Sequence, residues 1–185
     1  ALQIDPWDGR IWLGGPAFQA TRLYRADVLG NAVANANLAA LITTGSGTQA
    51  VALDLDGNPV VAPDNAMTFL VPNAGGGLFR VNRNTGAVPR LIGGPTNWPF
   101  NHFGACKAVC TDDAGNLWFG VTNDGITAGR IYRLAPGPHG DYAAPPTLLG
   151  PVPAPTTAGN ISNIEWAPAR GTRPERIWFT AGGAA

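Results

Sequence analysis

The chain has 185 residues, of which 45% are hydrophobic and only 13% are charged, and this apolar content predicts a folded globular protein rather than a disordered one. Twelve basic and twelve acidic residues cancel, so no basic surplus exists to bind a nucleic-acid backbone or an anionic membrane surface. No apolar run approaches the roughly 18 residues of a membrane-spanning helix. We therefore expect no nucleic-acid partner and no membrane span.

The 25 Gly and 17 Pro are scattered between short apolar runs and show no collagen-like period. This distribution is typical of turns between many short strands. No stretch has good helical periodicity. Residues 32–41 come nearest, but Asn residues and a Val dilute the pattern, and the segment falls where a strand is expected. The composition and pattern together predict an all-β chain.

Two short phrases recur along the chain. The first is DGRIWLG at 8–14, DGNPVVA at 56–62, AGNLWFG at 114–120 and, more loosely, RIWFT at 176–180. The second follows the first three copies, as RLYR at 22–25, GLFRV at 77–81 and GRIYRL at 129–134. The glycines at positions 9, 57 and 115 lie 48 and 58 residues apart, a repeat period stretched by loop insertions.

Each repeat contains four short strands. In the second repeat they are expected at 50–55, 58–62, 77–82 and 87–92. Val51, Leu53 and Leu55 alternate with smaller or polar residues, as in a half-buried strand. A tight turn joins the first pair. Its Asp54, Asp56 and Asn58 have the first spacings of a calcium loop, but Gly57 comes too early, which favours a plain turn.

The repeats predict β-propeller blades of four antiparallel strands, about three and a half in this chain. We expect blades at 2–43, 49–92 and 107–149 and a partial blade at 161–180, all within one segment, 1–185. So short an array exposes blade faces, so we expect further chain or a partner subunit to close the ring, and favour a longer polypeptide. The start at Ala1, without Met, indicates a processed chain or part of one.

The phrases GNLWFG at 115–120 and GRIYRL at 129–134 resemble the repeats of NHL-type propellers and of their virginiamycin B lyase-like and gluconolactonase-like relatives. The resemblance covers residues 2–180. It implies that the Trp and Phe of each phrase pack between blades and that the Gly-Asn pair forms a turn. Such phrases occur in enzymes and in non-enzymes, so the resemblance concerns architecture.

The resemblance also suggests where a metal ion would bind. Lyase relatives use a His base and a Glu-held magnesium ion, but neither His102 nor His139 aligns with that motif. Lactonase relatives hold a divalent ion with Glu, Asn and Asp from inner strands. The segment NIEWAP at 163–168 is similar to their Glu-containing strand, which makes Asn163 and Glu165 candidate ligands for calcium or magnesium. We carry neither activity over.

Glu165 is also a candidate from its position alone. Together with Asn163, Asp112 and Asp54 from equivalent strands, it would line a central channel and offer oxygen ligands to a hard cation. The alternative is that these side chains are polar only because the channel is wet. Cys106 and Cys110, four residues apart, allow three interpretations: small buried apolar side chains, a disulfide or a metal site.

Long connections gather at one end of the predicted sheets, where second strands lead to third and fourth to first. They are residues 14–21, 43–48, 64–76, 93–106, 123–128 and 150–160. Long loops on a rigid scaffold are where binding concentrates. The connection with the most aromatic residues contributes Trp98, Phe100, Asn101 and His102, and a second contributes Asn123 and Asp124. These residues suit a protein or carbohydrate partner, or the aromatic side chains simply cover the blade end.

Two hypotheses about function follow from the sequence. The first is a non-catalytic scaffold that presents its long-loop face for recognition or assembly, as an extracellular, periplasmic or virion-associated module. The second is a segment of a metal-dependent lactonase or lyase-like enzyme. The absence of a nucleophile elbow and of a phosphate-binding loop in the sequence favours the first.

Overall fold

The computed structural model describes residues 2–5, 9, 11–14, 22–26, 32–37, 48–63, 78–80, 90–92, 106–121, 130–138, 142, 144, 146–151 and 158–183. Every regular element within these ranges is a β-strand, and all strand pairs are antiparallel, which confirms the all-β prediction. The same ranges contain no helix long and apolar enough to cross a lipid bilayer.

The strands form three four-stranded sheets and a final hairpin, each in simple chain order. The first sheet contains β1 (Leu2–Ile4), β2 (Ile11–Gly14), β3 (Arg22–Ala26) and β4 (Ala32–Asn37). The second contains β5 (Thr48–Leu53), β6 (Pro59–Pro63), β7 (Leu78–Arg80) and β8 (Arg90–Ile92). The third contains β9 (Cys106–Thr111), β10 (Leu117–Val121), β11 (Arg130–Leu134) and β12 (Thr147–Pro151). The hairpin contains β13 (Ala158–Ala167) and β14 (Arg176–Gly183).

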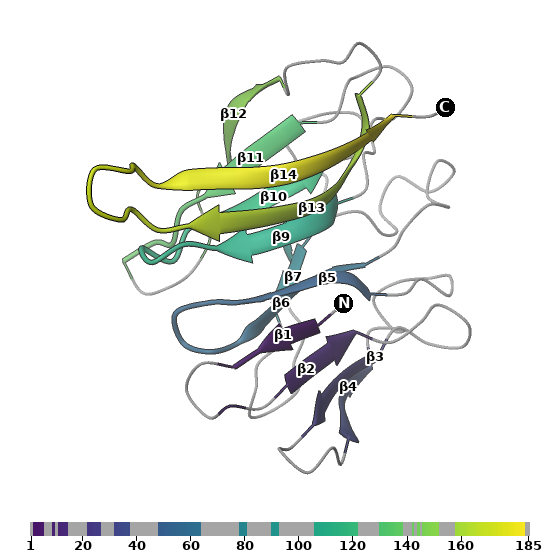
Figure 1. Ribbon diagram of the computed structural model, residues 1–185. Helices are drawn as coiled ribbons and strands as arrows, with labels where there is room; N and C mark the ends of the chain where they lie inside the picture. The colour runs from purple at the N-terminus through teal and green to yellow at the C-terminus, as the bar shows by residue number, and fades with distance from the viewer. Residues whose placement is uncertain are drawn as a thin grey trace.

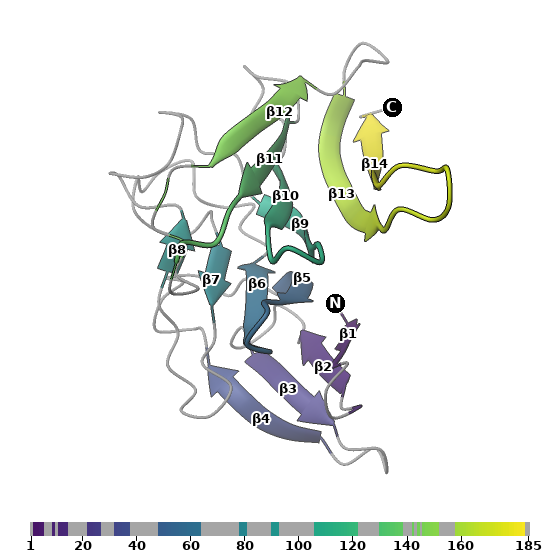
Figure 2. The same cartoon turned by 90° about the vertical axis from the view of Figure 1, so that its left-hand side faces the viewer.

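The sheets are stacked face to face along the chain, from the first sheet to the final hairpin (Figure 1). The first strand of each unit lies nearest to its counterparts, with β5 beside β1 and β9, and β9 beside β13. Strands β4, β8 and β12 lie at the opposite, outer edge, so that the sheets fan out from the line of first strands (Figure 2). The ends of four first strands therefore meet at one place.

Three of the four first strands, β1, β5 and β9, are each followed directly by an Asp, namely Asp5, Asp54 and Asp112. Strand β5 was expected to continue to position 55 but ends at Leu53, because the Asp54 carboxylate accepts hydrogen bonds from the backbone N–H groups of Asp56 and Asn58. Gly57 supplies the positive φ of 74° that this turn needs. The turn predicted at these residues is confirmed.

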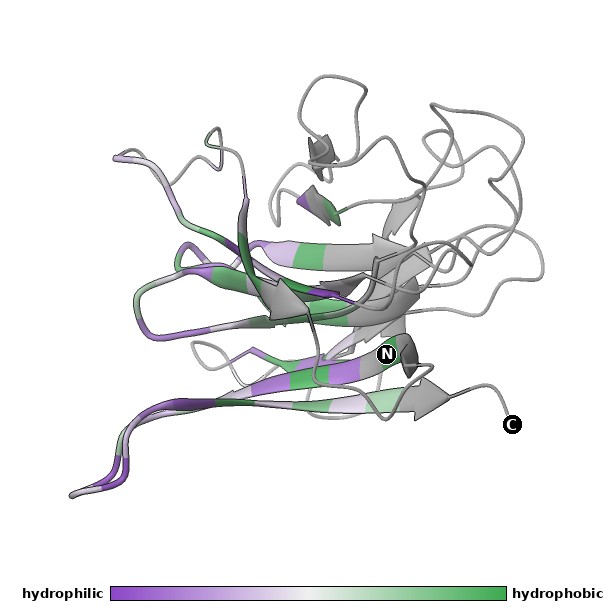
Figure 3. Cartoon of the chain, turned by 90° about the horizontal axis from the view of Figure 1, so that it is seen from above, coloured by the Kyte–Doolittle hydropathy of each residue, from purple (hydrophilic) through white to green (hydrophobic). Residues whose placement is uncertain are grey.

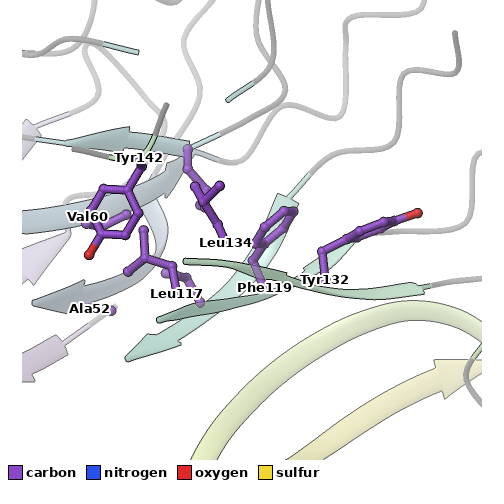
Figure 4. Close-up of a cluster of buried hydrophobic side chains, with 9 residues drawn as sticks. Ala52, Val60, Leu117, Phe119, Tyr132, Leu134 and Tyr142 are labelled. Carbon is purple, nitrogen blue, oxygen red and sulfur yellow. The ribbon is translucent and has the colours of Figure 1, made fainter. Parts of the chain in front are cut away.

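The main core fills the space between the second and third sheets (Figure 4). From the third sheet, Leu117, Phe119 and Leu134 are fully buried, and the Phe119 and Tyr132 rings stack with centroids 5.5 Å apart. Val60 of β6 is equally buried on the other side. Each such side chain contributes about 1.5–3 kcal/mol by leaving water, so the sheets are held together by their faces.

A second core joins the third sheet to the final hairpin. Ala108 and Ile131 meet Ile161 and Ile164 of β13, and all four are buried. Gly120 lets the two strands approach closely, because a Cβ atom at this position would lie 2.3 Å from Cγ2 of Ile161. The close approach of β13 to β10 therefore depends on the absence of a side chain at position 120.

The connection between β11 and β12 contributes a core residue that no sequence pattern indicated. Tyr142 is 6% exposed, and its hydroxyl donates a hydrogen bond of 2.9 Å to the carbonyl of Gly115. Gly115 also contacts the preceding sheet, since a Cβ atom there would lie 2.6 Å from Cδ1 of Leu55. The tight turn of the third sheet is thus fixed from two sides.

The outer face of the first sheet exposes aliphatic side chains. Leu2 and Ile4 are 59% and 57% exposed. Counting back from the Asp that ends each first strand, Leu2 corresponds to Val109, which is buried in the core against the second sheet. The same face of the repeat is therefore covered in the third sheet and open in the first.

The final hairpin also has an open side. Trp178 pairs with Glu165 across the hairpin and is 59% exposed, whereas Ile164, one position before Glu165, is buried against the third sheet. The tip of the hairpin carries the exposed residues Arg170, Arg173 and others, and projects beyond the sheets as a hydrophilic extension (Figure 3). Its turn is closed by paired backbone hydrogen bonds between Arg170 and Arg173.

Candidate functional site

The ends of the four first strands enclose a depression of about 430 Å³. Its lining comes from β1, from β5 and β9 with the turns that follow them, and from β13. Residues as far apart in sequence as Gln3 and Glu165 therefore share one site. We call it the strand-end pocket. It lies where the short turns 54–58 and 112–116 join first strands to second strands, which we call the tight-turn end of the sheets.

Two of the carboxylates in the strand-end pocket are used by the fold. Asp112 accepts hydrogen bonds from the backbone N–H groups of Ala114 and Asn116, from the Asn116 side chain and from Nε1 of Trp118 at 2.8 Å. The buried Asp54 forms the same kind of turn and an ion pair with Arg80. Both carboxylates therefore hold their own turns, which is a structural role.

The first sheet has a similar arrangement, in which an Asp after the first strand is hydrogen-bonded to a Trp on the second. Asp5 is fully buried, and Nε1 of Trp12 donates to its carboxylate at 3.4 Å. The backbone N–H of Gly9 donates to the Asp5 carbonyl, and Gly9 has a φ of 71°. In both the first and the third sheet, a Trp on the second strand thus donates a hydrogen bond to the Asp that follows the first strand, and this bond anchors the turn to its sheet.

The carboxylates of Asp113 and Glu165 are exposed instead. Both residues line the strand-end pocket, and the structure shows no salt bridge from either to another described residue. Glu165 extends from the open side of β13, where its strand neighbour Ile164 points into the core. Among the described carboxylates of this pocket, these two are exposed and free to reach a ligand.

The side chain of Cys110 lies beside these carboxylates as a free thiol. Burial raises its pKa to about 12, and the negative charges of Asp112 and Glu165 act in the same direction. Cys106 and Cys110 are both on the extended strand β9, so the disulfide interpretation is wrong. The structure shows Cys110 as a half-buried side chain packed against the second core.

We expect Cys110 to react slowly with iodoacetamide at pH 8 in the folded protein, because its thiol stays protonated. Glu165→Gln removes one charge that raises the pKa and should increase the rate, whereas Glu175→Gln at the hairpin should not. Peptide mass spectrometry measures this directly, since trypsin cleaves after Lys107 and separates the two cysteines. Equal alkylation rates in the wild type and in Glu165→Gln would contradict the conclusion that the charge of Glu165 raises the pKa of Cys110.

The same pKa shift has a consequence for stability. The folded-state pKa is raised above the unfolded value, so folding favours the neutral thiol. This contribution is fully present below about pH 8.5 and is lost as the pH rises toward 12. Burial likewise raises the pKa of Tyr142, so both groups weaken the fold in alkali.

The residues predicted from the sequence are distributed differently. Trp98, Phe100, Asn101, His102, Asn123 and Asp124 lie outside the described residues. Asn163 and Glu165 are both exposed on β13, but only Glu165 lines the strand-end pocket, together with Asp54 and Asp112. Among the described residues, no three His, Cys, Asp or Glu side chains are placed to hold one metal ion. The metal site at Asn163 and Glu165 stays a prediction.

Sequence reasoning missed most of this site. Gln3, Cys110, Thr111, Asp113 and Trp166 were not brought together by any motif. One signal was available, because Gln3 and Cys110 both lie two positions before the Asp that ends a first strand. An alignment of the repeats on that Asp would have placed Gln3 and Cys110 at equivalent positions.

Comparison with known proteins supports the fold. No family model matches the chain, and no curated protein does. The solved structure of a luciferin-regenerating enzyme matches with a TM-score of 0.54 and 15% sequence identity, over 89% of this chain and 48% of that one. An auxiliary nutrient binding protein from Bacteroides ovatus matches with a TM-score of 0.44 and 11% identity, over 96% of this chain and 51% of that one.

The chain spans about half the length of these two solved proteins. At such low identity, the likeness to the luciferin-regenerating enzyme concerns the all-β fold alone. It carries no statement about substrate or activity.

Proposed function

We propose that the chain forms about half of a β-propeller, with each four-stranded sheet as one blade. The fan of sheets, with first strands innermost, supports this, as does the likeness to a protein of about twice the length. The blade boundaries 2–43, 49–92, 107–149 and 161–180 stay predictions. On this proposal the final hairpin supplies the two inner strands of a fourth blade.

The open faces support closure of a ring by further sheets of the same repeat. Leu2 and Ile4 expose a face whose counterpart is buried in the third sheet, and Trp178 is exposed at the other end of the stack. Burying such side chains releases apolar surface from water and lowers the free energy. We propose that the remainder of a longer polypeptide covers these faces.

This proposal predicts the mass of the native polypeptide. Mass spectrometry of the protein from its natural source should give a value well above the 19.1 kDa of these 185 residues. A native mass of 19.1 kDa together with a dimer in light scattering would instead assign closure to a second copy. A monomer of that mass would contradict closure altogether.

We propose that the propeller is a non-catalytic scaffold that recognises a protein or carbohydrate at its long-connection end. The observation that carries this proposal is the unequal length of the connections. Residues 64–77 and 93–105 separate strands at that end, whereas residues 54–58 and 112–116 suffice at the other end of the first strands. Long connections on a rigid sheet scaffold commonly carry recognition.

The aromatic connection provides the test. Trp98→Ala and His102→Ala should each weaken binding of a partner found by glycan array or by affinity capture at least 10-fold, because aromatic anchors dominate such interfaces. Binding is measured by surface plasmon resonance. Leu149→Ala, an exposed change on β12, is the control and should leave binding unchanged. Full retention of binding in both loop variants would contradict the proposal.

The alternative function is a segment of a metal-dependent lactonase or lyase-like enzyme. The observation that favours it is that Glu165, predicted as a ligand, lines a pocket at the first-strand ends. Calcium or magnesium should then raise the melting temperature of the wild type and not of Glu165→Gln. No thermal shift in the wild type would remove this alternative.

A further inference from the structure

We propose that the strand-end pocket binds a small organic cation that carries hydroxyl groups, of the amino sugar or amino polyol class. This site lies at the tight-turn end of the sheets, so it is separate from the loop-face recognition proposed above. The proposal goes beyond that function and does not depend on it.

The charge of the pocket selects for a cation. Among the described residues that line it, Asp54, Asp112, Asp113 and Glu165 are carboxylates, and none is a Lys, Arg or His. Arg80 is already paired with the buried Asp54 and with Asp56. A partly enclosed site with carboxylates of one sign concentrates positively charged ligands. The raised pKa of the Cys110 thiol, caused first by burial and then by Asp112 and Glu165, is consistent with this negative field.

The two exposed carboxylates define where an ammonium group would bind. Asp113 follows the end of β9, and Glu165 lies on the neighbouring first strand β13. Hydrogen bonds between an ammonium group and a carboxylate are among the stronger polar contacts. In the described part of the chain, no three acidic, His or Cys side chains gather closely enough for one metal ion. Carboxylates spread around a pocket in this way suit a larger organic cation.

Two buried polar atoms call for hydroxyl groups on the same ligand. Oγ1 of Thr111 and Nε1 of Trp166 are buried and have no hydrogen-bond partner within the described part of the chain, and both residues line the pocket. An indole N–H donates only, so it requires an oxygen acceptor, and a threonine hydroxyl can donate or accept. A polyol chain offers both functions, whereas a simple alkylammonium ion offers neither.

The size of the pocket agrees with a ligand of this class. Its volume of about 430 Å³ falls within the range of small-molecule sites, roughly 300–1,000 Å³. Leu55, which is 53% exposed, provides an apolar wall for the carbon chain of the ligand. The site thus combines a cation-selective rim with a polar interior.

The test compares N-methyl-D-glucamine with D-sorbitol, two polyols that differ in whether one end carries an ammonium group. Isothermal titration calorimetry with the 185-residue chain, at low salt and with EDTA present, should show saturable binding of the amine and at least 10-fold weaker binding of sorbitol. Saturable binding of neither compound, or equal binding of both, overturns the proposal.

Variants locate the binding. Glu165→Gln combined with Asp113→Asn should weaken amine binding at least 10-fold, and both positions are exposed, so the fold should be retained. Glu175→Gln removes the chain's other Glu, which does not line the pocket, and should leave affinity unchanged. Circular dichroism melting checks that each variant is folded. Equal affinity in the double variant and in Glu175→Gln overturns the assignment.

Alkylation of Cys110 gives an independent readout in the same pocket. The amine should slow modification of Cys110, and sorbitol should not. Thr111→Val, which removes the hydroxyl but keeps the side-chain shape, should weaken amine binding several-fold. Trp98→Ala should not affect any of these measurements, so failure of the loop-face proposal and failure of this one can be told apart.

Discussion

Gly120→Ala should lower the free energy of unfolding by about 1–3 kcal/mol, because the new methyl group has no space. Its Cβ atom would lie 2.3 Å from Cγ2 and 2.5 Å from Cβ of Ile161, so β13 must shift away from β10. Both strands belong to the core that joins the third sheet to the final hairpin. Urea unfolding followed by circular dichroism measures the effect.

A double-mutant cycle with Ile161 tests the cause. Ile161→Ala alone creates a cavity and should cost about 2–5 kcal/mol. In the Gly120→Ala background the same change should cost less, because the shortened side chain makes room for the methyl group. Additive effects of the two changes, or an unchanged stability of Gly120→Ala, would show that the close approach of these strands is not as described.

Asp112→Asn should destabilise the protein by about 2–4 kcal/mol, because it disturbs several partly buried hydrogen bonds at once. The Asp112 carboxylate accepts four hydrogen bonds, two from backbone N–H groups and two from the side chains of Asn116 and Trp118. An amide at this position keeps one oxygen and directs N–H groups toward the remaining donors. The turn and the second strand then lose their common anchor.

The neighbouring residue provides a matched control for this prediction. Asp113→Asn changes the same charge on an exposed side chain and should stay within about 0.5 kcal/mol of the wild type. Thermal unfolding followed by circular dichroism compares the two variants. If Asp112→Asn is as stable as Asp113→Asn, the carboxylate does not anchor the turn.

The strands of the second repeat show how well local sequence patterns predict the positions of strands. Strands expected at 50–55 and 58–62 are found at Thr48–Leu53 and Pro59–Pro63, and those expected at 77–82 and 87–92 at Leu78–Arg80 and Arg90–Ile92. The period-2 alternation of Val51, Leu53 and Leu55 predicted the first of these strands, and the recurring phrases and turn residues predicted the others. Strand β5 ends before position 55 because the side-chain hydrogen bonds of Asp54 begin a turn before the apolar pattern ends.

In the candidate site, local sequence patterns did not predict which carboxylates would be exposed. Asp54 and Asp112 were expected to offer ligands to a cation, but their carboxylates are hydrogen-bonded within their own turns, and Arg80 adds an ion pair to the first. Asp113, with the same side chain one position later, is exposed. Residue type could not distinguish the two roles, since both depend on which direction the chain takes after β9.

The sequence by itself determined that this chain is a series of short antiparallel strands joined by glycine-containing turns. These properties depend on residues a few positions apart, whose alternation and turn chemistry act locally. Only the tertiary structure decided which faces are covered and which side chains share the strand-end pocket. Gln3, Cys110 and Glu165 meet there because whole sheets pack face to face, and that packing depends on fitted contacts such as Gly120 with Ile161, between residues far apart in the chain.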